Sequence, residues 1–165
     1  MKQNTYLLLI ALLILGISCT SSEDCTEDRI AKLGVGFYTH ALIDTTKQIY
    51  ATRAINLDTL SVRGLAANGT LLDSILYKSK SIQKIYLPLN KFENSSKFVL
   101  TFKTAKDTVE VLHTNTDYYL SLECGCMKVH SIDTVLTTTH LVDSIKIINH
   151  KVNATNAEHI QIFIN

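Results

Sequence analysis

Apolar and polar side chains alternate along almost every segment of the chain after residue 31. The alternation is clearest in "LGVGFYTH" (33–40), "KFVLTFK" (97–103) and "EHIQIFIN" (158–165). A period of two places successive side chains on opposite faces of a β-strand, so one face of each segment is buried and the other is solvated. The pattern predicts roughly eight or nine short strands at intervals of about ten to twelve residues, with no helix after the first residues.

These strands predict an all-β fold, an antiparallel β-sandwich of immunoglobulin-like type, with a small β-barrel as the alternative. Tryptophan, expected in true immunoglobulin domains, is absent. Asn68-Gly69 predicts a tight hairpin, and Pro88 predicts an edge or terminal strand position. The side chains expected to face inward are Leu33, Val35 and Phe37; Ile85, Leu87 and Leu89; Phe98, Leu100 and Phe102; Val109, Val111 and His113; and Ile160, Ile162 and Ile164.

The first residues are typical of an export signal. Lys2 precedes the apolar stretch "YLLLIALLIL" (6–15), which is too short to span a bilayer but has the size of a secretory signal core. The following "GISC" resembles a bacterial lipobox, in which Cys19 is acylated. Gly16 departs from the usual leucine, so ordinary signal-peptide cleavage is the alternative. We therefore expect a lipoprotein signal peptide at 1–18, an acylated tether at 19–30 and a single β-sandwich domain at 31–165.

The tether "TSSEDCTEDR" (20–29) is hydrophilic and acidic. Its acidic cluster resembles the surface-export signals of Bacteroidetes lipoproteins, while a merely solvated tether is the alternative. The expected location is the outer membrane of the cell envelope, lipid-anchored on either the surface-exposed or the periplasmic face.

Three cysteines besides Cys19 remain, and an exported compartment permits disulfides. The strand pattern of "DYYLSLEC" (117–124) places Cys124 on the same, inward side as Tyr118, Leu120 and Leu122. The predicted disulfide is therefore Cys25–Cys124, with Cys126 as a free thiol. It would close a loop of about 100 residues and stabilise the fold by about 4 kcal/mol.

"CGC" (124–126) has two other interpretations. A strained Cys124–Cys126 bridge would suit thiol–disulfide exchange. A metal site would need further ligands, such as His113 or His130, brought together by the fold. The sequence contains no catalytic serine motif and no phosphate-binding loop, its charged residues give a net charge of only +1, and the basic residues are dispersed. We expect no enzyme activity, cofactor, metal or nucleic-acid partner.

Asp followed by Ser or Thr recurs along the chain. The pattern resembles the O-glycosylation site of exported Bacteroidetes proteins, although Asp-Ser/Thr also forms turns. Most matches are expected to be turns, with one or two modified, and the candidate acceptors are Thr45, Thr59, Ser74, Thr108, Thr134 and Ser144.

Three aromatic residues fall on the predicted solvent faces of their strands, namely Tyr86, Tyr119 and Phe163. If these strands share a sheet, the rings would form one binding patch; scattered or buried rings are the alternative.

The tether, "LPLN" (87–90), "LECGC" (122–126), "DSIKIINHKV" (143–152) and "EHIQIFI" (158–164) together resemble an uncharacterised, domain-of-unknown-function family of Bacteroidetes envelope lipoproteins. The resemblance matches Cys25 and Cys124 to the family's two cysteines, which supports their pairing. Cys126 stands where the family usually has an aromatic residue. The family implies no activity. We therefore expect a membrane-anchored, non-enzymatic binding or assembly module for an envelope protein or glycan, with a thiol–disulfide exchange protein as the alternative.

Overall fold

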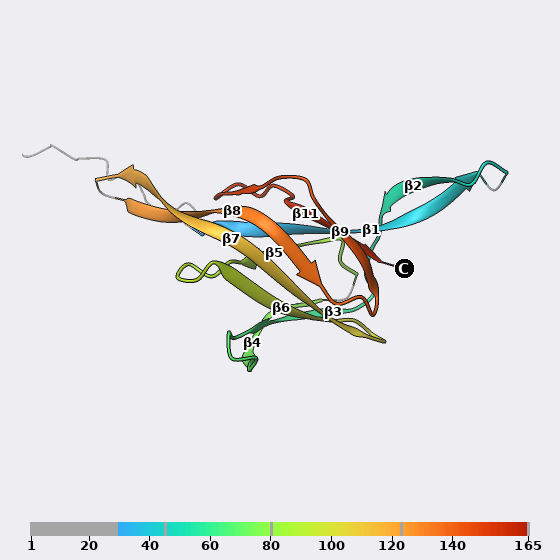
Figure 1. Cartoon of the computed structure of the whole chain (residues 1–165), viewed down its shortest axis with the longest axis horizontal. Helices are drawn as coiled ribbons and strands as arrows, with labels where there is room; N and C mark the ends of the chain where they lie inside the picture. The colour runs from blue at the N-terminus through green and yellow to red at the C-terminus, as the bar shows by residue number, and fades with distance from the viewer. Residues whose placement is uncertain (1–29, 45, 80, 123, 165) are drawn as a thin grey trace, which may run out of the picture.

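The computed structural model describes residues 30–44, 46–79, 81–122 and 124–164. Within these ranges the chain forms eleven strands and no helix (Figure 1). The strands are β1 (Lys32–Asp44), β2 (Ile49–Ala54), β3 (Leu60–Leu65), β4 (Leu71–Ser79), β5 (Lys84–Pro88), β6 (Ser95–Thr101), β7 (Lys106–Ser121), β8 (Gly125–Thr137), β9 (Val142–Ile147), β10 (Lys151–Val152) and β11 (Ile160–Ile164).

Two sheets pack against each other as a sandwich. One is antiparallel, with the strand order β10-β8-β7-β6-β3-β4, and the other has the order β2-β1-β11-β9, with β5 also paired to β1. The predicted sandwich is confirmed. The barrel alternative is wrong, because neither sheet closes on itself among the described strands.

The second sheet is mixed rather than antiparallel, because β1 and β11 pair in parallel. Such pairing needs a long connection between the strands, and here nearly the whole domain lies between them. The N–H of Gly34 donates to Nδ1 of His159 and the N–H of His159 donates to the carbonyl of Gly34, both at 2.8 Å. A Cβ at Gly34 would collide with the carbonyl of Ala157, so this close approach requires glycine.

The core consists of the alternating side chains that the sequence predicts. The fifteen inward residues predicted in the five alternating segments outside 117–124 are at most 7% exposed, from Leu33 in β1 to Ile164 in β11. The Asn68-Gly69 hairpin is confirmed between β3 and β4, with Gly69 at a φ of 82° and a hydrogen bond from Ala66 N to Thr70 O. Pro88 is exposed at the last position of β5, as predicted.

Three strands are longer than the short strands that the sequence predicts, with 13 residues in β1, 16 in β7 and 13 in β8. β6 pairs with β7 only up to Leu112, so the rest of β7 pairs with β8 alone in the described residues. Residues 39–44 of β1 likewise pair only with β2. Two hairpins therefore project from opposite ends of the long axis of the molecule (Figure 1).

The predicted inward face at the end of β7 is wrong. Tyr118 is 57% exposed, Leu120 is 38% exposed and Leu122 is 95% exposed. The alternation of burial in β7 stops after His113, because no sheet among the described strands covers either face of the projecting hairpin. We call the described residues of 117–128 the β7–β8 tip.

Candidate functional site

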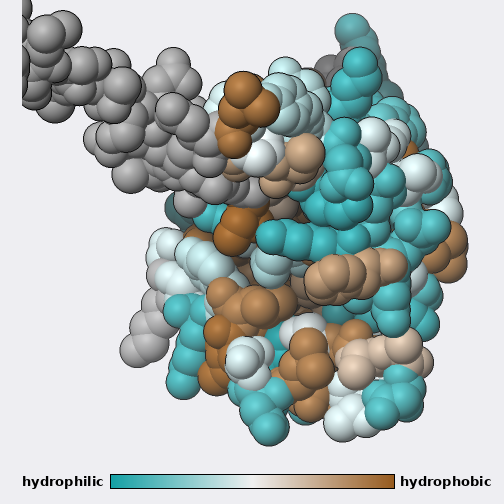
Figure 2. Space-filling view, turned by 90° about the vertical axis from the view of Figure 1, so that its left-hand side faces the viewer, coloured by the Kyte–Doolittle hydropathy of each residue, from teal (hydrophilic) through white to brown (hydrophobic). Residues whose placement is uncertain are grey.

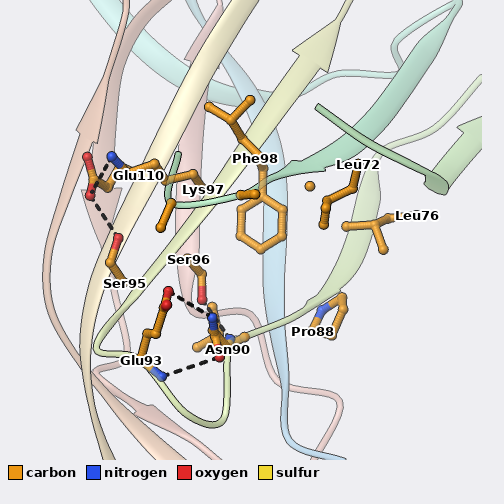
Figure 3. A pocket seen from close by; sticks show the side chains of 15 residues that line it. Leu72, Leu76, Pro88, Asn90, Glu93, Ser95, Ser96, Lys97, Phe98 and Glu110 are labelled. Carbon is orange, nitrogen blue, oxygen red and sulfur yellow. Dashed lines mark hydrogen bonds and ion pairs between the residues drawn. The ribbon is translucent and has the colours of Figure 1, made fainter. Parts of the chain in front are cut away.

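A cleft of about 570 Å³ lies between β4, the end of β5 and β6. Its apolar wall contains Leu72 and Leu76 of β4, Pro88 and Leu89, and Phe98 of β6. In Figure 3 the apolar side chains that carry labels, Leu72, Leu76, Pro88 and Phe98, lie on one side of the cleft, and the polar side chains lie on the other. The cleft is therefore amphipathic.

The apolar wall continues onto an uncovered edge of the antiparallel sheet. β4 is the last strand of this sheet among the described residues, so one row of its backbone N–H and C=O groups has no neighbouring strand. Its four large aliphatic side chains are 36–51% exposed: Leu71, Leu72, Ile75 and Leu76. Hydrophobic surface gathers in the lower part of Figure 2, at the height of β4. Folded proteins usually protect such an edge, so its exposure makes β4 a candidate surface for pairing with another strand.

The polar side of the cleft is built around the loop after β5. Asn90 Oδ1 accepts hydrogen bonds from the N–H groups of Phe92 and Glu93, which closes the loop as a tight turn. On the neighbouring strands Glu110 accepts a hydrogen bond from Ser95 Oγ at 2.7 Å and pairs with Lys97 Nζ at 3.3 Å (Figure 3). This rim carries both charges and lies beside the apolar wall.

Two buried histidines and one half-buried asparagine form a network that holds this loop on the sheet. Asn115 Nδ2 donates to the carbonyls of Asn90 and Glu93, at 3.1 and 2.9 Å. Asn115 Oδ1 lies 3.0 Å from His113 Nδ1 and 2.6 Å from His130 Nδ1. Because this oxygen can only accept, both rings are assigned as Nδ1–H donors, and all four hydrogen-bonding positions of the amide are used.

Both rings are neutral in this arrangement. Burial lowers the pKa of His113 below its usual value, and Asn115 and the Asp133 carboxylate only partly offset the effect. Burial also lowers the pKa of His130 to about 4, with further contributions from His113, Lys91 and Lys128.

Ser96 completes the network without becoming an exposed nucleophile. Its Oγ lies 2.8 Å from His113 Nε2, so its hydroxyl donates to the ring, and it accepts a hydrogen bond from Asn90 N at 2.7 Å. The order Ser96–His113–Asn115 resembles that of a catalytic triad, but Ser96 is only 6% exposed. The arrangement therefore fixes the Asn90–Glu93 loop.

Sequence reasoning missed this network, although a signal was present. Ser96 falls on the inward row of Phe98 and Leu100, and His113 falls on the inward row of Val109 and Val111. A polar residue on an inward row must find a buried partner. The sequence does not show that Ser96 and His113 would bond to each other, or that Asn90 and Asn115 would complete the network.

The two described cysteines differ in state. Cys124 is half-buried and disulfide-bonded, while Cys126 is an exposed free thiol opposite Tyr119. The predicted lipidation site Cys19 and the predicted partner Cys25 lie outside the described residues. The predicted inward position of Cys124 relied on the alternation of Tyr118, Leu120 and Leu122, and these side chains are exposed.

The predicted aromatic patch is not formed. Tyr86 and Phe163 lie in the mixed sheet and Tyr119 in the antiparallel sheet. Phe163 is 6% exposed and stacks on His40 with ring centroids 4.6 Å apart, because the β1–β2 hairpin covers that face of β11. Tyr119 is 57% exposed at the β7–β8 tip.

The expectation that most Asp-Ser/Thr pairs form turns is also wrong. Thr59 is exposed before β3, and Thr45 lies outside the described residues. The other four candidate acceptors lie within strands, where Ser74, Thr134 and Ser144 are exposed and Thr108 is half-buried. Asp73, Asp133 and Asp143 lie on the solvated parts of their strands, whereas Asp107 is buried.

Two structural features are absent from the described residues. No three His, Cys, Asp or Glu side chains there are grouped so that they could hold a metal ion. The same residues contain no helix with the length and apolar character needed to cross a membrane.

Comparison with known proteins returned one family. The model of a family of unknown function, DUF6452, matches residues 59–164. No curated protein and no solved structure matches the chain. The matched residues include the cleft, the buried network and the β7–β8 tip, whereas β1 and β2 precede them. Because the match covers more than half of the sequence, the chain belongs to the DUF6452 family of unknown function.

Proposed function

We propose that this protein is a lipid-anchored envelope lipoprotein of the Bacteroidetes type that binds an extended segment of a partner protein along β4. The observation that carries the binding role is the cleft beside the uncovered edge of β4. The lipid anchor at Cys19 and attachment to the outer membrane, on its periplasmic or outer face, are supported by the signal-like start and "GISC".

A polypeptide fits this site better than a glycan does. An added strand would hydrogen-bond to the free backbone row of β4 and place alternate side chains in the cleft. The cleft wall offers leucines and a proline, and its one aromatic lining residue, Phe98, is 3% exposed. Sugar recognition by stacking would need an exposed ring, so the lining favours an aliphatic side chain of a protein.

The charged rim would set the direction of the bound segment. Glu110 and Lys97 lie beside one end of the cleft, and the Asn90–Glu93 loop is held rigid by Asn115. A rigid rim reduces the ordering cost of binding.

Replacing Leu76 with Asp tests this role. A carboxylate in the apolar wall should weaken binding of the partner by at least about 1.4 kcal/mol, which is a factor of ten in the dissociation constant. The recovery of the native partner from chemically crosslinked envelopes should therefore fall at least about tenfold. Leu76 is 36% exposed, so the fold should tolerate the change. Leu136→Asp, at a 52% exposed position in β8, is the matched control and should retain the partner. Equal recovery with both variants would contradict the proposal.

Thiol–disulfide exchange is the second candidate, because the free thiol of Cys126 lies two residues from the bonded Cys124. A thiolate beside a disulfide is the arrangement from which exchange begins. Under the binding proposal, wild type and Cys126→Ser should be equally inactive in an insulin-reduction assay. Activity in wild type that disappears in Cys126→Ser would favour the oxidoreductase instead.

A further inference from the structure

The β7–β8 tip exposes four large side chains, three of which lie where the strand pattern would place a buried face. Tyr118 and Tyr119 are each 57% exposed, Leu120 is 38% exposed and Leu122 is 95% exposed. Tyr118 and Tyr119 are consecutive and point to opposite faces of the two-stranded hairpin. The tip therefore presents apolar area on both faces and at its end.

The chemistry of this tip suits the boundary between lipid and water. Tyrosine is enriched at membrane interfaces, where its ring enters the headgroup region while its hydroxyl stays hydrated. Leucine at the end of the hairpin adds apolar area. The nearest described charges neutralise each other, since Lys128 Nζ lies 2.8 Å from Asp117 Oδ1.

A Cys25–Cys124 disulfide would place this tip near the proposed anchor. Cys124 is disulfide-bonded and Cys126 is free, which supports the proposed Cys25–Cys124 bond. Cys25 follows Cys19 by six residues. Six residues span at most about 20 Å when fully extended, so an acylated Cys19 would hold the tip within that distance of the bilayer.

We propose that the β7–β8 tip inserts Tyr118, Tyr119, Leu120 and Leu122 into the surface of the membrane that holds the lipid anchor. This inference rests on the lipid anchor in the proposed function. This contact would fix the orientation of the sandwich on the membrane. The β1–β2 hairpin, which projects from the opposite end of the long axis, would then point away from the bilayer (Figure 1).

The absence of tryptophan from the sequence makes the contact measurable. Tyr119→Trp places one fluorophore at the tip, and Tyr50→Trp, at a 60% exposed position of the β1–β2 hairpin, is the matched control. Each full-length protein, produced in a lipoprotein-competent host, is reconstituted into phosphatidylcholine vesicles with or without bromine on the acyl chains. We expect blue-shifted emission and bromine quenching for Tyr119→Trp, and neither for Tyr50→Trp.

Vesicle flotation distinguishes a failure of the lipid anchor from a failure of the membrane contact. A protein that does not float, or floats equally after Cys19→Ala, has no anchor at Cys19, and then both the anchor and this orientation are wrong. A protein that floats through Cys19 but shows no quenching at position 119 keeps its anchor and overturns the membrane contact. Equal quenching at positions 119 and 50 would also overturn it. Leu122→Asp in the Tyr119→Trp protein should weaken the quenching, and because Leu122 is almost fully exposed, this loss cannot come from unfolding.

Discussion

Replacing Asp107 with Asn should lower the free energy of unfolding by about 2–6 kcal/mol, because an NH2 group in place of one oxygen leaves buried donors unpaired at about 1–3 kcal/mol each. The Asp107 side chain is 0% exposed. Its Oδ1 accepts from His140 N and Thr138 Oγ1, both at 2.8 Å, and its Oδ2 accepts from Leu141 N at 2.8 Å and Val142 N at 3.0 Å. An asparagine must turn an NH2 group toward some of these donors, which leaves buried N–H groups unpaired. Urea denaturation at about pH 7 measures the loss.

The effect should reach beyond one side chain, because Asp107 joins two sheets. It lies near the start of β7 in one sheet and accepts a hydrogen bond from the N–H of Val142, the first residue of β9 in the other. Burial raises its pKa, but the backbone N–H groups and Thr138 outweigh burial and hold the pKa well below its usual value. This stabilisation is therefore complete above about pH 4 and is lost as the pH falls toward the folded-state pKa. Asp73→Asn, at an exposed position beside Arg63, is the control and should change stability by less than about 0.5 kcal/mol. A similar loss for both variants would contradict the role of Asp107.

The sequence was sufficient to predict the strands and their buried faces wherever a second sheet covers them. In β6 and the first half of β7, inward and outward positions alternate without exception, from Ser96 to Phe102 and from Asp107 to His113. Burial of one face imposes a period of two, and that period is visible in a single sequence.

The same reasoning failed in the projecting hairpins. Tyr118, Leu120 and Leu122 continue the apolar alternation of β7, but they extend past the end of β6 and have no opposing layer. Phe163 shows the opposite error, since it falls on the outward row of β11 and is covered by His40 of β1. Alternation reports which side chains share a face. It does not report where the neighbouring strands end.

The candidate site depends on contacts between residues far apart in the sequence. Leu72 and Phe98 face one cleft only because β3 lies between β4 and β6 in the sheet. Asn115 reaches Asn90 across 25 residues and His130 across 15. A single sequence contains no signal for such pairings beyond the presence of polar residues on inward rows.

Acidification should destabilise the protein through the Asn115 network. The unfolded-state pKa of histidine is 6.5, and the folded-state pKa of His130 is about 4, so the unfolded chain binds the proton first as the pH falls. The contribution of His130 to stability should therefore be constant above about pH 7, decrease through the window between these two values and level off below it, for a loss of about 3 kcal/mol. Below this window the loss of the Asp107 stabilisation takes over. His113 and His159, whose pKa values are lowered chiefly by burial, add to the loss in the same direction.

Urea denaturation at a series of pH values measures this slope, and H130Q identifies its source. Glutamine can still donate a hydrogen bond to Asn115 Oδ1 but cannot take up the proton, so the variant should lose about 1.4 kcal/mol of pH dependence per pH unit. H40Q, at the exposed His40, should retain the wild-type slope. Protonation of either buried ring also places charge beside its partner, since the centroids of His113 and His130 lie 5.2 Å apart. The loss of stability should therefore be accompanied by loosening of the Asn90–Glu93 loop, seen as faster amide exchange at Phe92 and Glu93. An unchanged slope in H130Q would show that the acid sensitivity arises elsewhere and that the Asn115 network tolerates a charged ring.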